Sequence, residues 1–248
     1  MGADGAATLG TIYGQGTVLQ PVKKLQNISD RLMLGVSGSV GIGQRIAGMM
    51  GKMWDERKFA SVQSFQAMQA IRETLGPVLI QEIRYATEAA KLIGPQAAQQ
   101  ASVTTAVLAL PIGGHTHLYS FGCTGEPEEC TDQLPFVTIG SGQNLADPFL
   151  AFLRAVFWKN RVPNTGDGVF ATFWSLKHAI RRNTGGVADP IQIMKLIKDD
   201  HNNFVVKELE PEELEETDQA IKAAEEHLSR FDPRQAANIP PPVPSAPA

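Results

Sequence analysis

The stretch DRLMLGVSGSVGIGQRIAGMM, residues 30–50, decides the fold. It opens with a short apolar run, continues through a turn of glycine and serine, and ends with apolar residues at helical spacing. The apolar run favours a buried strand, the glycines break it, and the later spacing is typical of one face of a helix. The stretch therefore predicts a strand, a tight turn and a helix in direct succession.

The rest of the chain predicts strands in hairpins and helices in pairs. Apolar residues recur every three or four positions from Phe65 to Ile93, with Gly76 and Pro77 between them, which predicts two consecutive helices or one helix kinked at the proline. The remaining predicted elements are a hairpin over 102–121, a strand and turn over 134–142, helices over 143–158 and 169–182, a hairpin over 191–209 and an acidic helix over 210–231.

Composition narrows the class of protein. The 248 residues carry 22 lysines and arginines against 26 acids, so the net charge is −4 and nothing indicates the basic face that nucleic acid requires. No apolar run approaches the ~20 residues of a membrane span, and we expect a cytoplasmic protein without a membrane partner. The last 17 residues contain six prolines. We expect one domain over 1–231 and a disordered proline-rich tail over 232–248.

Cysteines, histidines and glycine turns give weaker signals. Cys123 and Cys130 flank TGEPEE and favour two reduced thiols, although a disulfide is the alternative. His115 and His117 alternate along a predicted strand and would need further ligands to hold a metal. The glycine-serine turns SGSVGIG (37–43) and GSGQ (140–143) match neither the phosphate-binding motif G-x-x-x-x-G-K-[ST] nor the dinucleotide-binding motif G-x-G-x-x-G. We therefore expect no cofactor and no metal.

Fragments in a fixed order resemble a known family. ADGAATLG (3–10), VKKLQNI (22–28) and DRLMLGVSGSVG (30–41) resemble the N-terminal half of proteasome β-type subunits, and look closest to the bacterial proteasome-like peptidase that works with a ring unfoldase. PFVTIGSGQ (135–143) and AIRRNTGG (179–186) also fit. The resemblance runs from Gly2 to about Phe231 and implies the N-terminal nucleophile hydrolase fold, an α+β protein built as a four-layer αββα sandwich.

The resemblance also implies a reaction and partners. Active members of the family assemble into stacked rings and degrade intracellular proteins with an N-terminal threonine, whose hydroxyl attacks the peptide carbonyl. The free α-amino group serves as the base, because it titrates near ~8 whereas an internal amide accepts no proton. The implied partners are polypeptide substrates, a homo-oligomeric double ring and an ATP-dependent unfoldase ring.

Catalytic residues are carried over position by position. Asp4 matches the acid beside the nucleophile, and Lys24 the lysine that lowers the pKa of its hydroxyl. Gly38 matches the glycine whose backbone N–H forms the oxyanion hole. Ser141 matches the serine near the terminal amine. Asn183 stands where many members have an aspartate that supports this serine, which is a departure from the family pattern.

Substrate contacts are implied at three further positions. Thr8 matches a residue whose backbone pairs with an extended peptide, and Val36 and Val40 fall where the pocket for the substrate side chain is lined. A first strand headed by threonine is expected ahead of Asp4, with Met1 as an internal methionine of that strand. The alternative is a non-catalytic ring or scaffold subunit that keeps the fold.

Overall fold

The computed structural model describes residues 1–9, 18–60, 62–94, 104–159, 161–182 and 186–232. The chain forms two compact units, Met1–Glu210 and Pro211–Ala248. The second unit contains α6 (Pro211–Ser229), which opens with Glu212 and Glu213 at the positive end of its dipole. The proline-rich segment from residue 233 onward, predicted as a disordered tail, lies outside the described residues.

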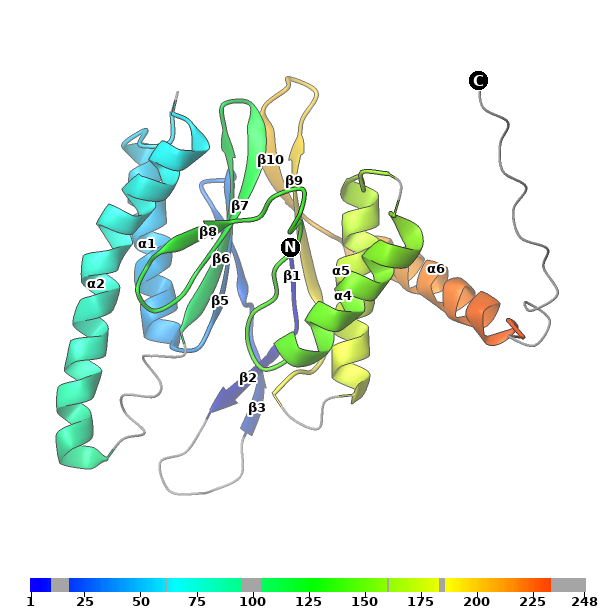
Figure 1. Ribbon diagram of the computed structural model, residues 1–248, viewed down its shortest axis with the longest axis horizontal. Coiled ribbons are helices and arrows are strands. Elements are labelled where there is room, and N and C mark those ends of the chain that lie inside the picture. The colour runs from blue at the N-terminus through cyan, green and yellow to red at the C-terminus, as the bar shows by residue number, and fades with distance from the viewer. Residues whose placement is uncertain (10–17, 61, 95–103, 160, 183–185, 233–248) are drawn as a thin grey trace, which may run out of the picture. The chain divides into compact units, whose positions relative to one another are not determined.

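A five-stranded antiparallel sheet forms the larger part of the first unit (Figure 1). Its neighbours follow chain order, as expected where each strand folds back on the one before it. Leu32 and Leu34 in the second strand are fully buried, and so is Leu108 in the third. The strands are β4 (Leu25–Ile28), β5 (Leu32–Ser37), β6 (Thr105–Ile112), β7 (His115–Phe121) and β8 (Pro127–Glu129).

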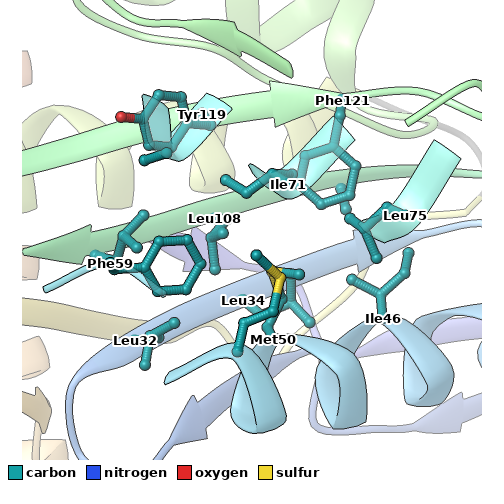
Figure 2. Packing of buried hydrophobic residues seen from close by; sticks show 14 of the residues in the cluster. Leu32, Leu34, Ile46, Met50, Phe59, Ile71, Leu75, Leu108, Tyr119 and Phe121 are labelled. Atoms are coloured by element: carbon teal, nitrogen blue, oxygen red, sulfur yellow. The ribbon is translucent and has the colours of Figure 1, made fainter. Parts of the chain in front are cut away.

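Two helices complete the core on this sheet. Helix α1 (Val40–Asp55) follows β5 after the turn at Gly38, and the side chain of its N-cap Ser39 accepts the N–H of Ile42. Helix α2 (Ser64–Ile93) is a single helix that contains Pro77. Figure 2 shows side chains of both helices meeting the sheet, and the labelled buried residues are Leu32, Leu34, Ile46, Met50, Phe59, Ile71, Leu75, Leu108, Tyr119 and Phe121.

A second, three-stranded antiparallel sheet has the order β1 (Gly2–Ala3), β9 (Gln192–Lys198) and β10 (Phe204–Glu208). Helix α5 (Thr165–Arg182) lies against β1 and β9, and α4 (Gln143–Phe157) packs on α5. A second apolar cluster joins the two sheets, with Leu25, Met33, Ala109, Met194 and Leu196 as its buried members.

The predicted four-layer αββα sandwich is wrong in that form. The structure gives an α+β unit with two antiparallel sheets, one of which has only three strands. Strands β2 (Ala6–Leu9) and β3 (Val18–Pro21) have no further strand partner among the described residues and form a two-stranded ribbon separate from both sheets. The acidic helix α6, expected within the same domain, falls in the second compact unit. The spacing of apolar residues predicts most of the individual helices and strands, but it does not predict how many strands each sheet contains.

The elements themselves mostly confirm the sequence predictions. The strand, turn and helix of residues 32–55 and both predicted hairpins form, and Cys123 and Cys130 are free. The predicted strand within 134–139 is wrong, because this segment has no ladder partner and Thr138 instead donates its hydroxyl to Asp147 of α4 at 2.6 Å. None of the described helices is both long enough and apolar enough to cross a membrane.

Replacing Ile71 by alanine tests the core on α2. Its side chain is fully buried against the five-stranded sheet, so Ile71→Ala should lower the free energy of unfolding by about 2–5 kcal/mol. Ile80→Ala is the matched control, since Ile80 lies on the same helix but is 41% exposed, and it should cost less than about 1 kcal/mol. Equal losses in urea denaturation would contradict the packing described.

The start of α5 should make stability depend on acid pH. Asp167 accepts two guanidinium N–H groups of Arg161, at 2.5 and 2.8 Å, and the backbone N–H of Asn164 at 2.9 Å. The hydrogen bonds from Arg161 are the main cause that holds the pKa of Asp167 well below its usual range. A depressed folded-state pKa contributes stability above the unfolded pKa and loses it as pH falls through the folded value.

Thermal melts should therefore show the contribution of Asp167 intact at neutral pH and declining below about pH 4. Asp167→Asn should lower the melting temperature at pH 7 and flatten its fall between pH 5 and 2, because the amide does not titrate. A variant whose acid profile runs parallel to that of the unchanged protein would contradict this assignment.

Candidate functional site

Asp4 and Lys24 form the centre of the candidate site. The ammonium of Lys24 donates to Asp4 Oδ2 at 2.8 Å, and the two side chains are 24% and 11% exposed. Twenty residues of sequence separate them, so the contact depends on the fold and not on local geometry. The sequence prediction that these residues share a site is consistent with this contact, although their chemical role stays a prediction.

The other carboxylate oxygen of Asp4 binds backbone. Its Oδ1 accepts the N–H of Ala6 at 2.9 Å and the N–H of Ala188 at 3.3 Å. The next residue, Gly5, donates its N–H to Ala188 O at 2.8 Å, and a Cβ at Gly5 would come within 2.8 Å of Pro190. Only glycine permits this close approach. Backbone hydrogen bonds from Ala6 and Ala188 therefore hold the Asp4 carboxylate in place independently of Lys24.

Gly38 lies at the same end of the sheet as Lys24. Leu25 pairs with Gly35 in the β4–β5 ladder, so the residue before β4 and the residue after β5 are close in register. Gly38 has φ +105°, a conformation that side chains rarely adopt, and a Cβ there would lie 2.8 Å from Thr104 Cα. The backbone therefore requires glycine at this turn, as the predicted oxyanion-hole role also would.

The turn that carries Ser141 approaches the same place. A Cβ on Gly140 would lie 2.8 Å from the hydroxyl of Ser37, which immediately precedes Gly38. Ser141 itself is exposed and donates its hydroxyl to Gly186 O at 3.1 Å. The structure thus gathers two predicted turns, 37–38 and 140–141, although they are far apart in sequence.

The remaining predicted residues differ in burial and in the element that carries them. Val36 packs against α1, where its side chain limits the space beside Gly43, whereas Val40 is 69% exposed at the start of α1. Thr8 lies in β2, opposite Leu19 of β3. Asn183 lies outside the described residues.

Sequence reasoning missed the segment 188–192. Besides the Ala188 backbone contacts, Gln192 on β9 accepts the backbone N–H of Lys24 at 3.0 Å. A lone glutamine and an alanine carry no local motif, so nothing in the sequence marks them. Only the pairing of β9 with β1, which sets Gln192 opposite Ala3, brings them to the site.

This arrangement has a limited chemical repertoire. A lysine ammonium beside a buried carboxylate stabilises negative charge on a neighbouring oxygen, and a glycine N–H in a positive-φ turn can donate to an oxyanion. Within the described residues, no three histidine, cysteine or acidic side chains come together to hold a metal. His117 instead shares its Nδ1 with Glu129 at 2.6 Å, away from this site.

The fold of this α+β protein is similar to that of solved Anbu structures. Anbu from Hyphomicrobium sp. strain MC1 is 18% identical with a TM-score of 0.59, over 93% of this chain and 92% of that chain. Anbu (ancestral beta-subunit) from Yersinia bercovieri is 13% identical with a TM-score of 0.60, over the same shares. The helical assembly of the Anbu complex from Pseudomonas aeruginosa is 16% identical with a TM-score of 0.60, over 97% and 92%.

No protein-family model and no curated protein matches the chain. The resemblance to proteasome β-type subunits and to the bacterial proteasome-like peptidase is therefore corrected, because these structural relatives are Anbu proteins, a distinct though proteasome-like family. The quoted fragments misled because they map to a ribbon, an ion pair and a turn of the fold itself. At 13–18% identity the likeness shows the fold alone.

Removing Asp4 should cost far more stability than removing a neighbouring acid. Asp4→Ala leaves the Lys24 ammonium and two backbone N–H groups without their acceptor, so unfolding free energy should fall by about 2–4 kcal/mol. Glu208→Ala is the control, because Glu208 pairs with adjacent Lys23 at an exposed position, where about 0–1 kcal/mol is expected. Chemical denaturation that ranks Glu208→Ala as the more damaging change would contradict this view of the pair.

Proposed function

We propose that this chain is a self-assembling subunit of a proteasome-like particle that acts as a ring or scaffold component. The observation that carries the proposal is the outer face of α4. Five exposed residues on one side of the helix are apolar, namely Pro148, Ala151, Phe152, Ala155 and Val156, and Asn144 is the exposed polar residue at the N-terminal end of that side. Phe152 is 48% exposed and Val156 50%. An exposed helix face with several large apolar side chains is normally covered by another surface.

The two charged residues of α4 form hydrogen bonds within the chain. Asp147 accepts hydrogen bonds from Thr138 and Gln143, and Arg154 donates to the carbonyls of Asp132 and Gln133. Both charges are therefore engaged within the chain. Burial of the apolar face against another copy is the arrangement that removes it from water at no cost in unpaired charge.

The structural relatives support the same assignment. The Pseudomonas aeruginosa relative is described as a helical assembly, and its fold matches this chain over 97% of the chain. A double ring, an unfoldase partner and a cytoplasmic location are further parts of the proposal that stand on the sequence alone.

Charge placed on α4 should break the particle. Phe152→Glu combined with Val156→Glu is expected to shift the mass from a multi-subunit particle to the ~27 kDa monomer, because carboxylates cannot be buried unpaired. Thr87→Glu adds charge at an exposed position on α2 and should leave the assembly intact. Mass photometry measures the outcome, with circular dichroism to verify folding. A protein that is monomeric without any substitution would contradict the proposal.

A second candidate function, peptide hydrolysis of the threonine type, is favoured by one observation. The Asp4–Lys24 ion pair and the positive-φ turn at Gly38 lie at one end of β4 and β5. In this proposal Asp4 and Lys24 activate a nucleophile, Gly38 binds the oxyanion, Ser141 with Asn183 orients an amine, and peptide contacts come from Thr8, Val36 and Val40.

An epoxyketone separates the two functions, because its adduct requires both the hydroxyl and the amine of one N-terminal nucleophile. For a scaffold subunit we expect no mass shift in intact-protein mass spectrometry of the assembled particle. Stoichiometric modification that is lost in Lys24→Met would establish hydrolysis as the function and remove the scaffold proposal.

A further inference from the structure

The side chain of Gln192 braces the segment that carries Lys24. Its Oε1 accepts the backbone N–H of Lys24 at 3.0 Å and that of Leu25 at 3.4 Å. Its Nε2 donates to the carbonyl of Val22 at 2.8 Å. One carboxamide therefore satisfies three backbone groups in four consecutive residues, just ahead of and at the start of β4.

The backbone of Gln192 is fixed to the other half of the pair. Gln192 lies opposite Ala3 in the β1–β9 ladder, and Ala3 immediately precedes Asp4. Four residues before Gln192, Ala188 donates to Asp4 Oδ1 and accepts the N–H of Gly5. The segment 188–192 thus contacts the Asp4 side through backbone and the Lys24 side through a side chain.

The Asp4 side and the Lys24 side are also joined through backbone, because Val22 donates its N–H to Gly5 O at 2.8 Å and β2 pairs with β3, whereas the N–H of Lys24 itself is held by Gln192. Lys24 has four rotatable side-chain bonds, and an ion pair that must order both its side chain and its backbone gains little net free energy. A backbone already held in place leaves only the side-chain rotamers to be ordered. Compared with a pair whose backbone is free to move, such a preorganised ion pair is broken for less of the time and has a more uniform geometry.

We propose that Gln192 is the positioning residue of the Asp4–Lys24 pair, acting through the backbone of Lys24 and Leu25. It bonds the backbone and not the charged groups, so its role is to fix the position of the Lys24 backbone from which the side chain extends to Asp4. The inference adds a residue to the site used by the second candidate function, and it rests on that function only for its catalytic meaning. The geometry itself holds for a scaffold subunit as well.

Two substitutions separate positioning from general support of the fold. Gln192→Met is close in size but makes no hydrogen bonds, whereas Gln192→Glu keeps an oxygen that accepts the two N–H groups. In the full chain, Gln192→Met should speed amide hydrogen exchange of Lys24 and Leu25 by about tenfold, the loss of roughly one hydrogen bond each. Core amides of Leu34 and Leu108 should exchange as before. Gln192→Glu should restore most of the protection.

The lysine side chains give a readout that a merely structural role would not move. Acylation by an N-hydroxysuccinimide ester, followed by peptide mass spectrometry, compares Lys24 with Lys23 in the same molecule. The ammonium of Lys23 pairs with Glu208 and not with Asp4, so it serves as the internal reference. Gln192→Met should raise the Lys24 to Lys23 rate ratio several-fold, and Gln192→Glu should bring it back toward its original value.

The outcomes divide cleanly. An unchanged acylation ratio and unchanged exchange at Lys24 and Leu25 in Gln192→Met would overturn the proposal, as would faster exchange spread equally over the core. If Gln192→Met does not fold, Asp4→Asn decides: protection of the Lys24 and Leu25 amides should survive loss of the ion pair, and its loss there would overturn the brace. Because none of these readouts uses activity or assembly, they can fail while the proposed function holds.

Discussion

The carboxylate of Asp4 is the interaction on which this end of the molecule depends. It collects donors from three separate parts of the chain, the backbone of Ala6, the backbone of Ala188 and the ammonium of Lys24. A buried carboxylate is tolerated only where such donors are already in place. The Asp4 carboxylate therefore connects three segments: the β2–β3 ribbon, which begins at Ala6, the segment just before β4, and the segment just before β9. The turn at Gly38 lies at the same end of the molecule.

Part of this was accessible from sequence. The strand, turn and helix of residues 32–55 follow from a change of apolar spacing on either side of a glycine-serine turn, which is local information. The order of the flanking fragments predicts Asp4 and Lys24 as members of one site, and the structure places their side chains in contact, while their catalytic role stays a prediction. Gln192 was invisible because its importance comes from a register between β1 and β9 that no local pattern encodes.

Two errors have physical causes of the same kind. Residues 134–139 are apolar and β-branched, yet Pro135 offers no N–H to a ladder and Thr138 is held by Asp147 of α4. Conversely, α2 continues through Pro77, where the Gly76 backbone lies against the turn at Gly125 and no side chain intervenes. In both places tertiary contacts override the local preference. The assignment to a family failed because one fold is used by more than one family, so fragments that indicate the fold do not identify the family.

The protein combines an internally braced ion pair with an apolar helix face that a single chain leaves in water. Cryo-electron microscopy of the purified full-length protein tests this most directly, because one reconstruction shows both features. We expect a multi-subunit particle in which Phe152 and Val156 of α4 are buried against another copy, with Lys24 in contact with Asp4. A population of single chains at micromolar concentration, with α4 still exposed, would contradict the account.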